Sequence, residues 1–152
     1  SRLFEEVREK MGLAYSINTF FDDYTTYGAM ATYAGVEHEN AEKTIPIILN
    51  EYKKIKERAV PAEELLRTKE SMKGHLALSL ESSNALAFYV GGEEVSTGNP
   101  LTVDEVFSKI DRVTAEEVQK TAREIFKKES LNLAIIGPFK DDTKFQKLLA
   151  DF

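Results

Sequence analysis

Hydrophobic and polar residues follow two different periods at the start of the chain. A first apolar stripe recurs at helical spacing and consists of Leu3, Phe4, Val7 and Met11. From residue 13 to residue 21 the pattern changes to alternation, which is typical of a strand with one face buried. Gly12 lies between the two patterns, where a helix C-terminus favours a residue that tolerates positive φ. The sequence therefore predicts a helix over residues 2–11 that leads directly into a strand over residues 13–21.

The remaining strand signals predict a hairpin and one later strand. A polar turn at residues 22–26 precedes a run over residues 27–36 that is rich in small side chains. Two strands joined by a short polar link indicate a hairpin, and the small residues favour close packing against it. The continuous apolar run Leu131–Ile136, which ends at Gly137-Pro138, predicts a buried strand.

Helices are predicted between these strands and at the end of the chain. Apolar stripes indicate a helix over about 40–58 and a long helix that starts at Pro61. The buried side of the long helix is predicted to carry Leu65, Met72, Leu76 and Leu80. Ser82-Ser83-Asn84 is expected to break it before a helix through Val90. Two capping boxes, at Thr102–Glu105 and Thr114–Glu117, start helices over about 103–110 and 115–128, and residues 143–152 form a closing helix.

The order of strand pair, helix run and strand predicts the fold class. It is α+β, with a largely antiparallel sheet and helices layered on one face. The length of 152 residues corresponds to one domain, residues 1–152, that is large enough to bury a core.

Composition and charge exclude some function classes. The net charge of −6 argues against a nucleic-acid partner, because phosphate binding needs clustered Lys and Arg. The short basic run around Lys53 and Lys56 has glutamates interleaved and is interpreted as a solvated helix face. The absence of Cys rules out disulfides and thiolate chemistry and fits a reducing compartment. The source compartment stays open, with a cytoplasmic location slightly favoured. No apolar run has the length of about 20 residues that a membrane span needs.

The opening stretch resembles a known family. Ser-Arg-Leu-Phe, followed by Arg-Glu-Lys-x-Gly-Leu-Ala-Tyr-Ser, is similar to the C-terminal half of the pitrilysin/insulinase family of zinc metallopeptidases, which includes the mitochondrial processing peptidases. Four later stretches fall in family order: Pro61–Leu65, Leu78–Ser82, Val113–Val118 and Ala134–Pro138. The resemblance implies the processing-peptidase fold, also known from LuxS, in which two such halves face each other around a chamber.

The resemblance also implies which parts of the enzyme this chain does not contain. The family's zinc motif is H-x-x-E-H, whereas this chain has only His38 and His75, too far apart for that motif. We therefore expect the chain to be a truncated C-terminal half that lacks a zinc site and is inactive alone. Zinc belongs to the N-terminal half, which would be its partner, and the first strands and helix of the C-terminal half would precede Ser1.

Arg8 and Tyr15 are the candidate substrate-binding residues. Arg8 lies on the last turn of the first helix, where an arginine is also explained by the helix dipole or by an ion pair with a nearby glutamate. Tyr15 lies early on the strand, where tyrosine is commonly a packing residue. In the family, an Arg and a Tyr with this spacing face the zinc site. The resemblance thus implies that Arg8 and Tyr15 hydrogen-bond a peptide carbonyl or the oxyanion of the reaction.

The other titratable residues give weaker signals. His75 is interpreted as a packed or surface histidine, and His38, between Glu37 and Glu39, as at most a weak metal binder. Glu5, Glu6 and Glu9 are expected to be solvated. The sequence offers no Ser-His-Asp set and no phosphate-binding glycine loop.

Two other functions stay open, together with an expectation about assembly. The chain is alternatively a non-catalytic structural or assembly subunit of the same family, or a peptide-binding module without catalysis. If strands precede Ser1 in the family domain, the sheet of this chain has exposed edges, and apolar side chains such as Ile17, Phe21, Tyr27 and Tyr33 lose cover. We therefore expect self-association through the hairpin, most simply as a two-fold dimer.

Overall fold

A computed structural model describes all residues, Ser1–Phe152. Its internal contacts divide the chain into two compact units, each described below by itself. Unit 1 consists of residues 1–22, 29–58 and 119–152, and unit 2 consists of residues 23–28 and 59–118. Unit 2 is thus largely one continuous segment, whereas unit 1 is assembled from separated parts of the sequence.

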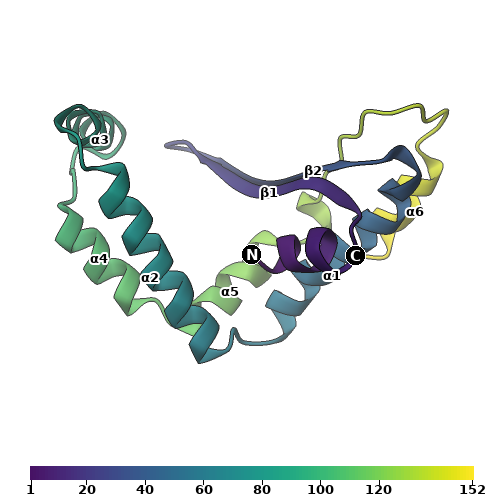
Figure 1. The fold of residues 1–152 in the computed structure, drawn as a ribbon, viewed down its shortest axis with the longest axis horizontal. Helices are drawn as coiled ribbons and strands as arrows, with labels where there is room; N and C mark the ends of the chain where they lie inside the picture. The colour runs from purple at the N-terminus through teal and green to yellow at the C-terminus, as the bar shows by residue number, and fades with distance from the viewer. The chain divides into compact units, whose positions relative to one another are not determined.

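Unit 1 contains the opening helix, most of the hairpin and the last helices of the chain (Figure 1). In chain order the elements are η1 (Phe4–Lys10), β1 (Ala14–Asp23), β2 (Gly28–Val36), η2 (His38–Asn40), α1 (Ala41–Glu57), α5 (Ala115–Ile125), η3 (Lys128–Ser130) and α6 (Thr143–Ala150); the first four residues of α5 belong to unit 2. β1 and β2 form a two-stranded antiparallel sheet, in which the Thr19 and Thr32 hydroxyls pair across the strands at 2.7 Å. The predicted hairpin is confirmed.

The core of unit 1 lies between η1, the hairpin and α1. Its buried residues are Leu3, Val7, Ala14 and Ile17, with Ile48 and Tyr52 of α1 packed against them. The Tyr52 hydroxyl donates to Thr32 Oγ1 of β2 at 2.5 Å, and its ring stacks on Phe126 at 4.3 Å between centroids. Burial of the Tyr52 phenol raises its pKa. These contacts fix η1 and α1 against the hairpin, so the start of β1 has a rigid support.

The two segments of unit 1 that flank residues 59–118 are hydrogen-bonded to each other. The carbonyl of Lys56, near the end of α1, accepts hydrogen bonds from Gln119 Nε2 at 3.1 Å and from Arg123 Nε at 3.0 Å on α5. At the other end of α1, Lys144 of α6 forms an ion pair with Glu42 at 2.8 Å. Segments far apart in the sequence thus converge on α1.

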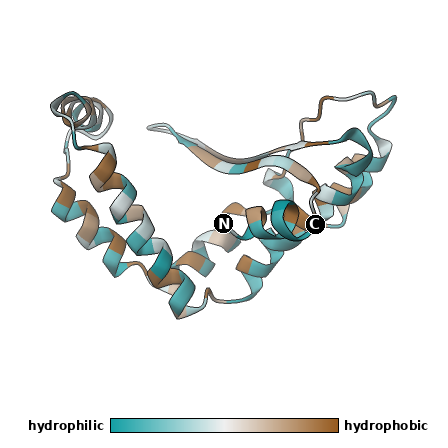
Figure 2. Cartoon of the chain, viewed as in Figure 1, coloured by the Kyte–Doolittle hydropathy of each residue, from teal (hydrophilic) through white to brown (hydrophobic).

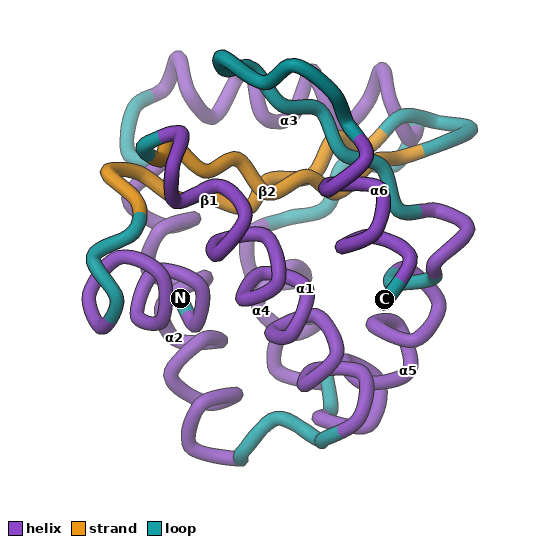
Figure 3. The backbone as a smooth tube through the Cα atoms, turned by 90° about the vertical axis from the view of Figure 1, so that its right-hand side faces the viewer, coloured by secondary structure: helices purple, strands orange, loops and turns teal.

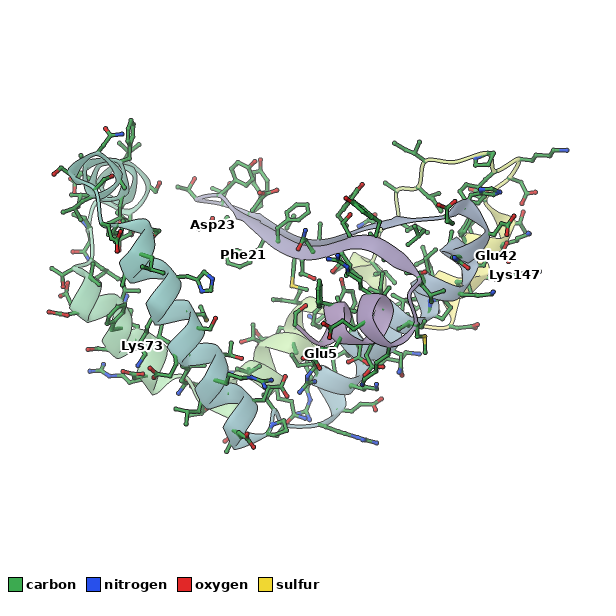
Figure 4. The ribbon with its side chains drawn as sticks, viewed as in Figure 1. Glu5, Phe21, Asp23, Glu42, Lys73 and Lys147 are labelled. Carbon is green, nitrogen blue, oxygen red and sulfur yellow. The ribbon has the colours of Figure 1, made fainter.

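Unit 2 contains three helices, α2 (Ala62–Ser79), α3 (Ser83–Thr97) and α4 (Val103–Arg112). Lys73 of α2, labelled in Figure 4, pairs with Asp111 of α4 at 2.9 Å and with Glu70 at 2.7 Å. Lys69 donates to the Asp111 carbonyl at 2.8 Å. Both α2 and α4 carry hydrophobic positions (Figure 2), but no side chain of α2, α3 or α4 is fully buried. The predicted buried side of α2 is therefore only half-buried at best, and Met72 is exposed.

Helix boundaries follow the local signals in the sequence. Both predicted capping boxes form, since Thr102 and Glu105, and likewise Thr114 and Glu117, satisfy each other's backbone N–H groups. The helix predicted only as far as Val90 continues through two glycines to Thr97. There Gly98 ends it with a φ of 64°.

The predicted strand over Leu131–Ile136 is wrong. This segment joins η3 to α6 as a loop (Figure 3), and the Ile136 side chain is fully exposed. A strand requires a neighbour for its N–H and C=O groups, and the sheet contains only β1 and β2. The chain is therefore mostly helical with one antiparallel hairpin, while a larger sheet with all helices on one face stays a prediction. None of the helices combines the length and the hydrophobicity that crossing a membrane requires.

Candidate functional site

The helix that carries Arg8 is wound more widely than an α-helix. Residues Phe4–Lys10 form a π-helix. It ends at Gly12, whose φ of 60° lies in the left-handed region, as predicted. The Leu13 N–H donates to the Val7 carbonyl at 2.9 Å, and the Gly12 N–H to the Arg8 carbonyl at 3.2 Å. Each bond spans one residue more than in the usual Schellman ending. Such local π winding is frequent at functional sites.

Arg8 is exposed, and its guanidinium lies over an aromatic ring. The Arg8 Cζ atom is 5.0 Å from the centroid of the Phe4 ring, within the range of a cation–π contact. The adjacent ion pair on this helix joins Glu6 to Lys10 and does not include Arg8. The hydrogen bond from Lys10 lowers the pKa of the Glu6 carboxyl. The Glu6 carboxylate is thus paired with Lys10 rather than with Arg8.

Tyr15 is the second residue of β1, and its side chain is 88% exposed. Its neighbours Ala14 and Ile17 are buried in the core of unit 1, so the backbone at Tyr15 is anchored while the phenol is open to solvent. A side chain this exposed contributes little to packing within this chain.

Arg8 and Tyr15 therefore share three features: each is exposed, each lies on a regular element, and the two elements meet at Gly12. That the guanidinium and the phenol point into the same space stays a prediction. Figure 4 shows two further side chains of these elements: Glu5 on the first turn of η1, and Phe21 on β1 toward the turn of the hairpin.

The histidines do not form a metal site. His75 lies on α2, where its Nδ1 is 2.7 Å from the Ser71 carbonyl. His38 lies in η2 and is 3.9 Å from Glu39. No group of three or more potential ligands comes together in the chain. The residues present thus do not fit the zinc that the resemblance assigns to the family.

One residue of this site was missed by sequence reasoning. Phe4 was assigned only to the apolar stripe of the helix, and it does pack against the core. The signal for its second contact is its spacing of four residues from Arg8, which places two side chains on one face of a helix.

Comparison with known proteins extends the resemblance over the chain. The family model described as "Peptidase M16 inactive domain" matches residues 1–72, which include Arg8 and Tyr15. An uncharacterized zinc protease of Streptomyces coelicolor is 33% identical over 93% of this chain and 30% of its own length. The uncharacterized zinc protease YmxG of Bacillus subtilis is 36% identical over 91% of this chain and 34% of its own length. The chain thus spans about a third of these relatives.

Solved structures show the same fold. A chain of complex III2 from Candida albicans matches with a TM-score of 0.72 and 21% identity, over 81% of this chain and 29% of that chain. The periplasmic protease PqqL from Escherichia coli matches with a TM-score of 0.63 and 15% identity, over 80% of this chain and 14% of that chain. Together with the opening motif, the family model and the curated relatives lead to one conclusion: the chain belongs to the pitrilysin (M16) family of zinc peptidases and corresponds to its C-terminal, inactive domain.

Proposed function

We propose that this chain is the half of a zinc-dependent endopeptidase that does not bind zinc. It closes the chamber against the N-terminal half and binds the peptide substrate through Arg8 and Tyr15. The observation that carries the proposal is the exposure of these two polar groups on either side of the Gly12 turn, with backbones anchored in the core of unit 1. The matched family domain supports it, because residues 1–72 include both positions.

The chemistry of the two side chains suits a carbonyl that gains negative charge. The Arg8 guanidinium donates charge-assisted hydrogen bonds to oxygen acceptors. The Tyr15 phenol is a further donor, and its single hydroxyl suits one carbonyl or oxyanion oxygen. Donors aimed at developing charge stabilise a transition state more than a ground state. In this proposal zinc and the general base come from the N-terminal half, because no ligand set assembles in this chain.

Arg8→Ala and Tyr15→Phe test the proposal in a protein that contains both halves. Each variant is expected to lower kcat/KM for a peptide substrate by on the order of 100-fold, the effect of losing one oxyanion donor. Zinc content and the thermal unfolding midpoint should not change, because both side chains are exposed. Lys10→Ala and Tyr33→Phe are matched controls, since they remove an exposed cation of η1 and an exposed phenol of β2. Near wild-type kcat/KM in both test variants would refute the assignment.

A non-catalytic assembly subunit is the second candidate function. One solved structure with this fold is a chain of complex III2, so the fold also occurs in a component of a larger complex. The companion half distinguishes the two functions: an intact H-x-x-E-H motif predicts a peptidase, and its loss predicts an assembly subunit. A peptide-binding module without catalysis would instead bind peptide with this chain alone, which titration calorimetry measures.

A further inference from the structure

The η1 helix carries two pairs of side chains at the same spacing. Glu6 and Lys10 are four residues apart and form an ion pair, in which the charge of the lysine is compensated. Phe4 and Arg8 are also four residues apart, and here the guanidinium lies over a ring, 5.0 Å from its centroid. Four residues before Arg8, at the spacing where Lys10 has a glutamate, the chain thus has an aromatic residue.

A ring and a carboxylate hold a guanidinium in different ways. A carboxylate accepts hydrogen bonds from the N–H groups and cancels the charge. The face of a ring attracts the cation through its quadrupole and accepts none of the conventional hydrogen bonds of those N–H groups. A guanidinium held by a ring therefore keeps its charge and its donors for another acceptor.

The support for the Phe4 ring is rigid. Phe4 is half-buried and packs against the core cluster of Leu3, Val7, Ala14 and Ile17. The same cluster anchors the start of β1, on which Tyr15 lies. Arg8 by contrast is exposed, and a long exposed side chain loses rotamer entropy when it is ordered on a ligand. A contact that restricts it in advance reduces this cost.

We propose that Phe4 is a positioning residue for Arg8: its ring holds the guanidinium in place for an incoming oxygen ligand without neutralising it. The proposal rests on the proposed function, in which Arg8 binds the substrate carbonyl or the oxyanion. It adds the reason why a half-buried aromatic residue precedes Arg8 by four positions on a helix rich in glutamate.

The ring contact itself is tested by NMR on the chain of residues 1–152. Protons above the face of an aromatic ring are shielded, so the Arg8 Hδ and Hε resonances should lie upfield of those of Arg67, an exposed arginine on α2. Phe4→Leu should remove this shift and Phe4→Tyr should retain it. If Phe4→Leu does not fold, Phe4→Met, which fills irregular apolar space, replaces it. Unshifted Arg8 resonances in the wild-type chain would overturn the proposal.

The functional consequence is tested by a double-mutant cycle in the protein that contains both halves. Phe4→Leu should lower kcat/KM roughly two- to five-fold, the factor that corresponds to a cation–π contact at an exposed site. Phe4→Tyr should preserve kcat/KM, and the effect of Phe4→Leu should disappear in the Arg8→Ala background. Glu6→Gln, which weakens the other pair of η1, is the matched control and should leave kcat/KM unchanged.

Failure of the positioning role and failure of the proposed function give different results. If Arg8→Ala lowers kcat/KM but Phe4→Leu has an equal effect with and without Arg8, Phe4 acts only through packing and the positioning role is wrong. If Arg8→Ala itself leaves kcat/KM unchanged, the proposed function of Arg8 is wrong and the positioning role fails with it.

Discussion

The glycine that joins η1 to β1 provides a sharp test of the local structure. At Gly12 the backbone has a φ of 60°, and a Cβ built there would meet nothing within 4 Å. A substitution by alanine is therefore sterically free but conformationally strained. The left-handed conformation costs a residue with a Cβ about 1–2 kcal/mol. Alanine also restricts the unfolded chain more than glycine does, which stabilises the folded state by about 0.4–1 kcal/mol. Gly12→Ala should thus lower the free energy of unfolding by about 1 kcal/mol.

A second glycine gives the matched control with the opposite sign. Gly74 lies in the interior of α2, also with nothing within 4 Å of a built Cβ, but its φ is not positive. Because glycine destabilises a helix interior by about 0.5–1 kcal/mol relative to alanine, Gly74→Ala should raise stability. Urea titration followed by circular dichroism measures both changes, with m compared among the variants. The units are fitted as separate transitions if the curve requires it.

Two further variants isolate the cause. Gly12→Asn should cost less than Gly12→Ala, since asparagine tolerates the left-handed region better. Gly98→Ala, at a φ of 64° and also unobstructed, should repeat the loss in unit 2. A Gly12→Ala protein as stable as the wild type would refute the left-handed junction, and with it the helix ending that separates Arg8 from Tyr15.

Three further predictions concern metal content, pH and assembly. The purified, untagged chain should contain no stoichiometric zinc by elemental analysis, because no ligand set assembles; about one zinc per chain would contradict this. Hydrogen bonds from the backbone N–H and the hydroxyl of Thr102 lower the pKa of Glu105. The stabilisation of the folded state by the ionised Glu105 carboxylate is therefore complete above the unfolded-state pKa and is lost as pH falls through the folded-state pKa. Acid titration of helicity should show this loss of stability in the wild type and less of it in Glu105→Gln. Self-association through the hairpin should appear in sedimentation at tens of micromolar, because Phe21, Tyr27 and Tyr33 are exposed. Ile17, which was also expected to lose cover, is buried, so that part of the expectation was wrong. A monomer with a cooperative melt would exclude self-association.

Local signals predicted the elements whose formation depends on neighbouring residues. Gly12 marked a helix end, and Thr102 and Thr114 marked helix starts, because capping is decided within a few positions of the chain. The hairpin followed for the same reason, since a short polar turn sets its register. Elements that depend on distant partners were not predictable in this way.

The strand predicted at Leu131–Ile136 and the winding of η1 illustrate this limit. An apolar run indicates burial, but strand formation requires a pairing partner that the pattern does not contain. The π winding of η1 was not predictable either, because an apolar stripe indicates which face is buried and not how many residues each turn contains. For the site, the family motif identified Arg8 and Tyr15, whereas Phe4 was assigned to packing alone.

The hydrogen bonds on the Lys56 carbonyl have a consequence for how this chain tolerates change. Gln119 and Arg123 both donate to this one atom, so residues 59–118 leave and re-enter unit 1 at neighbouring points. The entropy cost of closing a loop rises only slowly with its length, by about 0.6 kcal/mol for each doubling. The stability of unit 1 should therefore depend only weakly on the length of the segment between Arg58 and Gln119. We therefore expect this junction to tolerate changes in the length of the segment inserted there, while the Arg8–Tyr15 segment keeps its support in unit 1.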